Sequence, residues 1–212
     1  MANNYYYIVA GFPELLLDFE NKPFNFLHLK EEVRGMLDDK DRRLVDWLLL
    51  GREEQKLSSH FYRVATTLNC RFIRDYYSFD LQLRNILSAV SARKAGQDPS
   101  LYLIGNNEFT EALTHSKAAD FGLKEQSELV ASLLAILEEV HILEREQKID
   151  QLRWEKGNEI CASHFFDIDV ILCFLLKASI IHRWMLLDKI QGQQLFKTLV
   201  KEITDTRQHN SK

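Results

Sequence analysis

The stretch "LKEQSELVASLLAILEEVHILEREQKIDQLRW", residues 123–154, carries the strongest helical pattern in the chain. Its apolar residues recur at spacings of three and four, which places them on one face of a helix: Leu129, Leu133, Ile136, Val140 and Leu143. At about 1.5 Å per residue, one helix of this length would span about 50 Å, more than a compact domain of this size requires. We therefore expect this helix to kink or to project, with its charged end solvated or docked against a partner helix.

The flanking sequence continues the helical pattern on both sides. Glycine and proline are scarce, and Gly96 with Pro99 marks a break that opens a polar connection through residue 107. Upstream of it, we expect helices that are interrupted near Asn69 or Ser78. After Gly157, the apolar segments 161–192 and 193–203 predict two helices that are buried deep in the fold.

The N-terminus has a different composition. "YYYIVA", residues 5–10, is aromatic and β-branched, and prolines follow at positions 13 and 23. This composition favours a short strand or extended segment, although the sequence offers no second strand to pair with it. We predict an all-α fold, a multi-helix bundle of two related helical units with a short extended start. The units are residues 1–107 and 108–203, and residues 204–212 form a flexible tail.

Composition excludes several functional classes. The chain has 212 residues, 46% of them hydrophobic, a formal net charge of -4 and a pI of about 6.0. No basic stripe suggests a nucleic-acid partner. The longest apolar run, residues 170–176, is too short to cross a bilayer. Cys70, Cys161 and Cys173 form no C-x-x-C motif, which favours reduced thiols and a cytoplasmic location.

Two groups of residues have the chemistry of metal ligands. Glu138-x-x-His141 has the spacing found in di-iron bundles, but such a site needs a second copy, which the chain lacks. The segment "CASHFFDID", which we place at a helix N-terminus, offers further ligand types: Cys161, His164, Asp167 and Asp169. Acidic residues are also favoured at a helix N-terminus by its dipole, so we predict that neither group binds a metal ion.

Nucleophilic catalysis has little support. Ser58, Ser59 and His60 are adjacent in sequence, but no glycine turn beside them could form an oxyanion hole. The chain has no G-x-S-x-G motif, no phosphate-binding loop and no G-x-G-x-x-G motif. We therefore predict no catalytic residues, no cofactor and no small-molecule substrate.

Two helix ends share a signature, Arg93-x-x-Gly96 and Lys189-x-x-Gly192. A cation in the last turn with a glycine after it is also a common helix cap, so chance similarity is one explanation. The other is duplication: the pattern resembles the helical repeat of the V/A-type ATPase family that includes the d subunit of the vacuolar enzyme. The asparagine of that repeat is present as Asn85, whereas the second copy has Ile181 in its place.

The resemblance covers under half of the chain, but the opening "NNYYYIVAGFPEL" is also similar to bacterial proteins associated with V-type ATP synthase gene clusters. The resemblance implies a non-catalytic helical adaptor at the cytoplasmic face of the membrane. This adaptor would couple the central stalk to the membrane rotor ring. Arg93 and Lys189 would then bind acidic residues of a stalk helix. The alternatives are a helical interaction module unrelated to an ATPase and a metal-dependent enzyme built around His164 and Asp167.

Overall fold

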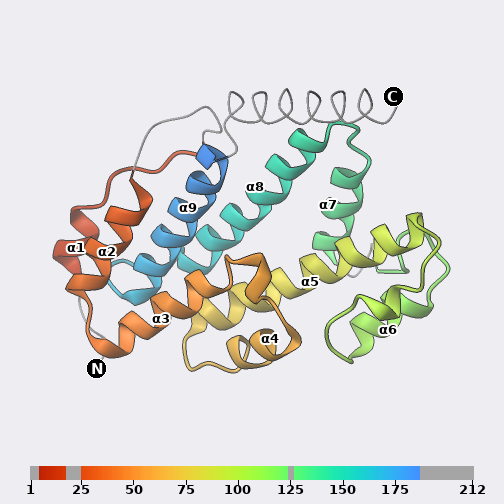
Figure 1. The fold of residues 1–212 in the computed structure, drawn as a ribbon, viewed down its shortest axis with the longest axis horizontal. Helices are drawn as coiled ribbons and strands as arrows, with labels where there is room; N and C mark the ends of the chain where they lie inside the picture. Colours follow the sequence, from red (N-terminus) through yellow and green to blue (C-terminus); the bar gives the residue numbers. More distant parts are fainter. Residues whose placement is uncertain (1–4, 18–24, 124–126, 187–212) are drawn as a thin grey trace, which may run out of the picture.

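The computed structural model describes residues 5–17, 25–123 and 127–186, and all of their regular elements are helical (Figure 1). The α-helices in these ranges are α1 (Tyr6–Ala10), α2 (Phe26–Met36), α3 (Asp39–Leu50), α4 (Ser59–Ala65), α5 (Arg71–Lys94), α6 (Glu108–His115), α7 (Glu128–Leu137), α8 (Ile142–Cys161) and α9 (Ile168–Leu186). Two short 3-10 turns, η1 (Glu54–Lys56) and η2 (Pro99–Leu101), complete them. The prediction of an all-α fold is confirmed.

The N-terminal segment is helical from Tyr6 to Ala10, so the predicted extended start is wrong. The Val9 amide donates to the Tyr5 carbonyl at 3.0 Å, and the Tyr5 amide donates to the Phe166 carbonyl at 2.7 Å. The preference of aromatic and β-branched residues for strands depends on a neighbouring strand to pack against. Without one among the described residues, the backbone closes its hydrogen bonds locally.

Among the described residues, two hydrophobic clusters form the core, and two long helices, α5 and α8, contribute to both. The first cluster lies among α2 to α4, α9 and the ends of α5 and α8 that are nearest to them. The second lies among α6, α7 and the opposite ends of α5 and α8. Figure 1 shows α5 running the length of this arrangement. The clusters do not follow the predicted boundary at residue 107, and the relatedness of two units stays a prediction.

The predicted helix over 123–154 is broken. Helix α7 ends at Leu137, and α8 begins at Ile142 after a turn. Both helices pack against α5, so the break allows each to bury its own apolar face there. Helix α8 then continues past Gly157 to Cys161, and a side chain at Gly157 would lie 3.1 Å from Leu176 of α9. This glycine permits close helix packing rather than ending a helix.

Other boundaries agree with the sequence patterns. The chain turns around Asn69 between α4 and α5, whereas Ser78 lies inside α5. Helix α5 ends in a Schellman motif, in which Gly96 has φ of 67° and the Gln97 amide donates to the Ala92 carbonyl at 2.8 Å. The predicted burial of α9 is confirmed, whereas residues 193–203 lie outside the described residues.

None of the helices formed by the described residues combines the length and apolar character that crossing a bilayer requires.

Candidate partner-binding surface and buried ionic network

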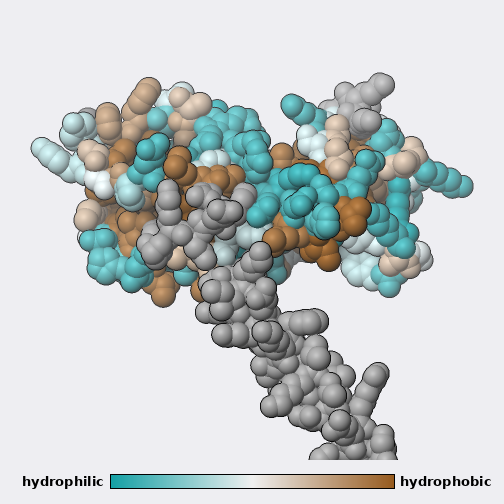
Figure 2. All heavy atoms as spheres, turned by 90° about the horizontal axis from the view of Figure 1, so that it is seen from above, coloured by the Kyte–Doolittle hydropathy of each residue, from teal (hydrophilic) through white to brown (hydrophobic). Residues whose placement is uncertain are grey.

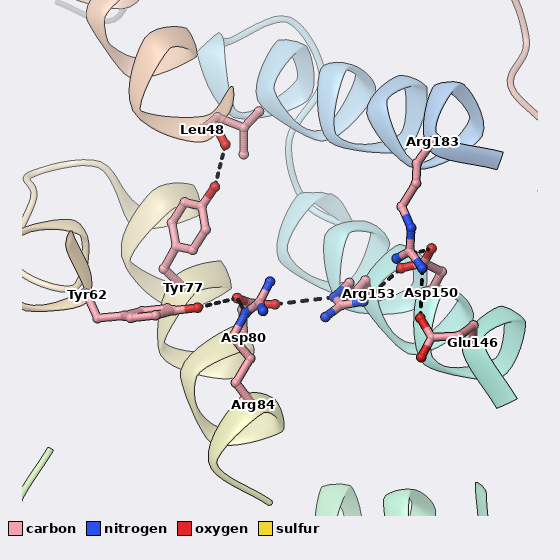
Figure 3. A network of polar contacts seen from close by, with 9 residues as sticks. All are labelled: Leu48, Tyr62, Tyr77, Asp80, Arg84, Glu146, Asp150, Arg153 and Arg183. Carbon is pink, nitrogen blue, oxygen red and sulfur yellow. Dashed lines mark hydrogen bonds and ion pairs between the residues drawn. The ribbon is translucent and has the colours of Figure 1, made fainter. Parts of the chain in front are cut away.

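Asp80 of α5 is the first centre of a buried ionic network (Figure 3). Its carboxylate accepts from the Tyr62 hydroxyl at 2.7 Å, from Arg84 Nε at 2.8 Å and from Arg153 Nε at 3.3 Å. These donors come from α4, α5 and α8. One carboxylate therefore holds three helices in register.

Asp150 of α8 is the second centre. It accepts from Arg153 Nη1 at 2.9 Å, from Arg183 Nη1 at 3.1 Å and from Trp184 Nε1 at 2.8 Å. Arg183 extends the network to Glu146, with Nη2 at 2.7 Å from Oε2. Figure 3 shows the resulting chain of contacts from α5 across α8 to α9. Its carboxylates and guanidinium groups are equal in number, so the charges balance.

The network occupies the junction of the two hydrophobic clusters. On α5, Asp80 lies between Tyr77 of the first cluster and Leu83 of the second. On α8, Asp150 and Arg153 lie between Ile149 of the second cluster and Trp154 of the first. Although burial by itself would raise it, the pKa of Asp80 lies below its ordinary value because of the positive charges of Arg153 and Arg84. These paired, buried charges link α4, α5, α8 and α9 at the junction of the two clusters.

The network was not predicted from the sequence, although one signal was present. Asp80 falls on the buried face of α5, three residues from apolar residues on either side, and Asp150 follows buried Ile149 on α8. A charged residue at an apolar position of a helix predicts a buried partner of opposite charge. The identity of that partner, 73 positions away in the case of Asp80 and Arg153, is not encoded in local spacing.

The turn between α7 and α8 exposes three large apolar side chains, and we call it the apolar turn. Val140, Ile142 and Leu143 are 84%, 68% and 61% exposed. Glu138 and Glu144 flank them and are also exposed. The turn lies at the upper edge of Figure 1, and the view from above in Figure 2 shows hydrophobic atoms on that face among hydrophilic ones. Val140 and Leu143 therefore do not belong to a buried face as their spacing predicted.

A groove of about 390 Å³ lies between the C-terminal ends of α5 and α7 and adjoins the apolar turn in sequence. Leu134 and Leu137 provide apolar lining, and Arg93 and Glu138 line it from the two helices. Since Glu138 both lines the groove and precedes the apolar turn, groove and turn together form one candidate surface for a partner.

Arg93 is occupied within the chain. Its Nη1 donates to the Ala118 carbonyl at 2.7 Å, and Nη2 donates to the Ser116 carbonyl. Its guanidinium carbon also lies 3.7 Å from the centre of the Phe121 ring. Arg93 thus holds the loop after α6 against α5. Its predicted role in partner binding stays a prediction, and Lys189 lies outside the described residues.

The predicted metal ligands are placed in different settings. Glu138 caps the end of α7 and His141 precedes α8, so they do not share a helix face as their spacing suggested. His164 Nδ1 lies 2.5 Å from Asp167 Oδ2, and its Nε2 lies 3.7 Å from Asp169 Oδ2. Across the described ranges, no three histidine, cysteine, aspartate or glutamate side chains are arranged to hold a metal ion.

Cys161, His164 and Asp167 do not share a helix, although the spacing of the three residues would place them on one helix face. Cys161 is the last residue of α8, whereas His164 and Asp167 belong to the turn before α9. In this turn Asp167 Oδ1 accepts from the Val170 amide at 3.3 Å, which makes it a cap of α9.

The serines near His60 have a local structural explanation. Ser58 is the N-cap of α4, and its Oγ accepts from the Phe61 amide at 3.2 Å. The ring of His60 lies against Arg63, with Nδ1 at 3.0 Å from Nη2. An exposed histidine held by an arginine is not arranged to activate Ser58 or Ser59.

Comparison with known proteins gives a family without an assigned activity. A family described as "Protein of unknown function (DUF2764)" matches residues 1–55 and 50–207. No curated protein and no solved structure matches the chain. Because the matched segments cover most of the sequence, the chain belongs to the DUF2764 family.

Proposed function

We propose that the protein is a non-catalytic helical adaptor of a V/A-type ATPase, which couples the central stalk to the membrane rotor ring. The segment containing Asn85 and Arg93-x-x-Gly96 supports the ATPase part of this proposal, because it resembles the repeat of the family that includes the vacuolar d subunit. The observation that carries the adaptor part is the apolar turn, where Val140 is 84% exposed. The adaptor lies at the cytoplasmic face of the membrane, held there through other proteins.

The energetics of the apolar turn favour a protein partner. Burying a large aliphatic side chain is worth about 1.5–3 kcal/mol, and Val140, Ile142 and Leu143 are largely uncovered in the chain alone. Exposed apolar residues that are rimmed by charged ones are typical of interaction sites. The groove between α5 and α7 adds Leu134 and Leu137 to the same surface.

The charges beside the apolar turn indicate the chemistry of the partner. Glu138 and Glu144 flank the apolar turn and are exposed. The cations that line the groove, Arg93 and Lys94, lie on α5, and the Arg93 guanidinium is bonded to backbone carbonyls. The partner is therefore an amphipathic helix of a stalk or ring protein, with an apolar stripe and basic residues beside it. This differs from the acidic stalk helix that Arg93 and Lys189 alone would favour.

The same surface also favours a second function. In this alternative, the protein is a helical interaction module of a complex other than an ATPase. The identity of the partner separates the two. A metal-dependent enzyme centred on His164 and Asp167 has weaker support, because these residues bond to each other and to the α9 backbone. Elemental analysis that found stoichiometric zinc or iron in the purified protein would favour the enzyme.

The test compares two triple variants in cells that contain a V/A-type ATPase, with antibodies against its stalk and ring proteins as the readout. The first variant changes the apolar turn: Val140→Ser, Ile142→Ser and Leu143→Ser. The matched control changes three large apolar residues of similar exposure elsewhere, which are 60%, 58% and 74% exposed: Leu27→Ser, Met36→Ser and Leu101→Ser. Melting temperatures establish that both variants fold.

We expect the wild type and the control to co-purify stalk or ring proteins, and the variant of the apolar turn to lose them. Equal co-purification by the two variants would show that the apolar turn is not the binding site. If the wild type binds neither stalk nor ring proteins, the ATPase function is wrong.

A further inference from the structure

Two of the three cysteines meet where α8 and α9 pack. Cys161 is the last residue of α8, and Cys173 lies on the buried face of α9. Cys161 packs against the hydrophobic cluster that contains Cys173, and both cysteines line one pocket. Backbone oxygens also hold the two sulfurs: Cys161 Sγ lies 3.1 Å from the Asp169 carbonyl, and Cys173 Sγ lies 3.3 Å from the Gly157 carbonyl.

Gly157 explains why the two sulfurs can approach. A methyl group at this position would lie 3.6 Å from Cys173 Sγ and 3.1 Å from Leu176 Cδ2. Its absence allows α9 to pack directly against the α8 backbone. Cys161 is one helical turn beyond Gly157 and on the same face of α8, so it lies beside Cys173.

The pair is accessible from solvent. A pocket of about 480 Å³ is lined by Cys161 and Cys173 together with Phe12, His164 and Lys177. Cys161 is partly exposed, whereas the third cysteine, Cys70, is buried and does not line this pocket. A small oxidant can therefore reach the pair without unfolding of the chain.

The two thiols differ in acidity. The neighbouring Cys161 thiol lowers the pKa of Cys173, and the positive charge of Lys177 acts in the same direction, against the effect of burial. The same contact, together with burial, raises the pKa of Cys161. Burial raises the pKa of Cys70 to about 11. Thiolates rather than thiols are nucleophiles, so Cys173 is the attacking sulfur and Cys161 the resolving one.

We propose that Cys161 and Cys173 form a reversible dithiol–disulfide pair that is oxidised by hydrogen peroxide or a related peroxide. The Cys173 thiolate attacks one peroxide oxygen; the S–O bond forms, the O–O bond breaks, and hydroxide leaves and takes up the proton that Cys173 lost. Cys161 then attacks the sulfenic sulfur of Cys173; the S–S bond forms, the S–O bond breaks, and the second hydroxide leaves with the Cys161 proton as water. An external dithiol reverses the reaction.

The disulfide would join the end of α8 to α9 through a covalent bond. Arg183 of α9 and Asp150 of α8 already link these helices at the other end of their contact. Oxidation would therefore fix the α8–α9 hairpin at both ends. This inference does not depend on the proposed adaptor function.

The test treats the purified full chain with a small molar excess of hydrogen peroxide and maps its peptides under non-reducing conditions by mass spectrometry. We expect a linked pair of peptides that contain Cys161 and Cys173, a loss of two hydrogen atoms from the intact mass, and recovery of both thiols with dithiothreitol. Cys70 serves as an internal control and should remain free. A disulfide that involves Cys70 would overturn the proposal, as would disulfides that form only between chains. The proposal would also be wrong if Cys161 and Cys173 both remained free thiols.

Variants identify which sulfur attacks first. In Cys161→Ser, the sulfenic acid on Cys173 has no resolving thiol, so a sulfenic-acid probe such as dimedone should label Cys173. In Cys173→Ser, the same probe should not label Cys161, because its thiol lacks the lowered pKa. Cys70→Ser should form the disulfide as the wild type does. Labelling of Cys161 in the second variant would contradict the assigned roles.

Discussion

Arg153 Nε donates to Asp80 Oδ1 at 3.3 Å and joins α8 to α5 across 73 positions of the chain. Both side chains are almost completely buried, and Arg153 also donates to Asp150. A guanidinium between two buried carboxylates is needed mainly because the carboxylates are costly to bury alone. This contact therefore fixes how α5 and α8, which contribute to both hydrophobic clusters, lie against each other.

Arg153→Met should destabilise the protein strongly, because it keeps most of the side-chain volume but leaves Asp80 and Asp150 short of positive charge. We expect a loss of about 3–5 kcal/mol in the free energy of unfolding. Arg84→Met is the control, since that side chain is 27% exposed and makes one ion pair with Asp80. It should cost about 1–2 kcal/mol. Urea unfolding followed by circular dichroism measures both; equal losses would contradict the central place of Arg153.

Asp80 should make stability depend on pH in the acid range. Its pKa in the folded protein is lowered, whereas an unfolded aspartate titrates at about 3.9. The stabilisation it provides is therefore fully present above the unfolded-state pKa and is lost as the pH falls through the folded-state pKa. For this reason, we expect the free energy of unfolding to decrease as the pH is lowered from about 4.

Asp80→Asn isolates this effect. The variant should be less stable than the wild type at neutral pH, because Arg153 and Arg84 lose their carboxylate. The difference in the free energy of unfolding between the two proteins should narrow from about pH 5 to about pH 2. A constant difference across that range, measured by urea unfolding at each pH, would show that Asp80 does not titrate as proposed.

Gly51 and Gly35 should respond in opposite directions to alanine. A methyl group at Gly51 would overlap the phenol ring of Tyr77, whose hydroxyl donates to the Leu48 carbonyl. Gly51→Ala should therefore cost about 1–3 kcal/mol or more. Gly35 lies inside α2 with no neighbouring atom within 4 Å of the added methyl, so Gly35→Ala should stabilise by about 0.5–1 kcal/mol. Thermal unfolding checks both, and a neutral Gly51→Ala would contradict the packing described.

Local patterns predicted those parts of the fold that depend on local chemistry. The helical class, the buried face of α9 and the glycine cap at Gly96 follow from apolar spacing and backbone conformation, and the structure contains all three. The break between α7 and α8 agrees with the kink expected from the length of the pattern, but its position was not predictable from spacing, because the apolar period continues through Val140 and Leu143. The break lets both helices pack on α5.

Contacts between distant segments were beyond the sequence patterns. Gly157 suggests a helix end, yet it lies inside α8, where an added methyl group would be in tight contact with Leu176 of α9, at 3.1 Å. The pairing of Cys161 with Cys173 arises from the same close approach of the helices. Arg93 was recognised as a cation near a helix end, but its hydrogen bonds to the loop after α6 depend on how that loop folds back.

Arg93→Glu distinguishes a structural role of this residue from the partner-binding role that the sequence suggests. The change removes the hydrogen bonds to the Ala118 and Ser116 carbonyls and the contact with the Phe121 ring, and it brings a carboxylate toward carbonyl oxygens. We expect a loss of about 2 kcal/mol in the free energy of unfolding and a lower melting temperature.

Lys94→Glu is the matched control for stability, because Lys94 is the next residue and is exposed, although it also lines the groove between α5 and α7. It reverses the same charge and should change stability by less than about 0.5 kcal/mol. Differential scanning calorimetry and co-purification of stalk proteins are measured on both variants and on Lys189→Glu. If Arg93→Glu unfolds at the wild-type temperature but loses the stalk proteins, Arg93 binds the partner and the structural role is secondary. If only its melting temperature falls, Arg93 holds the loop after α6, and partner binding depends on the apolar turn.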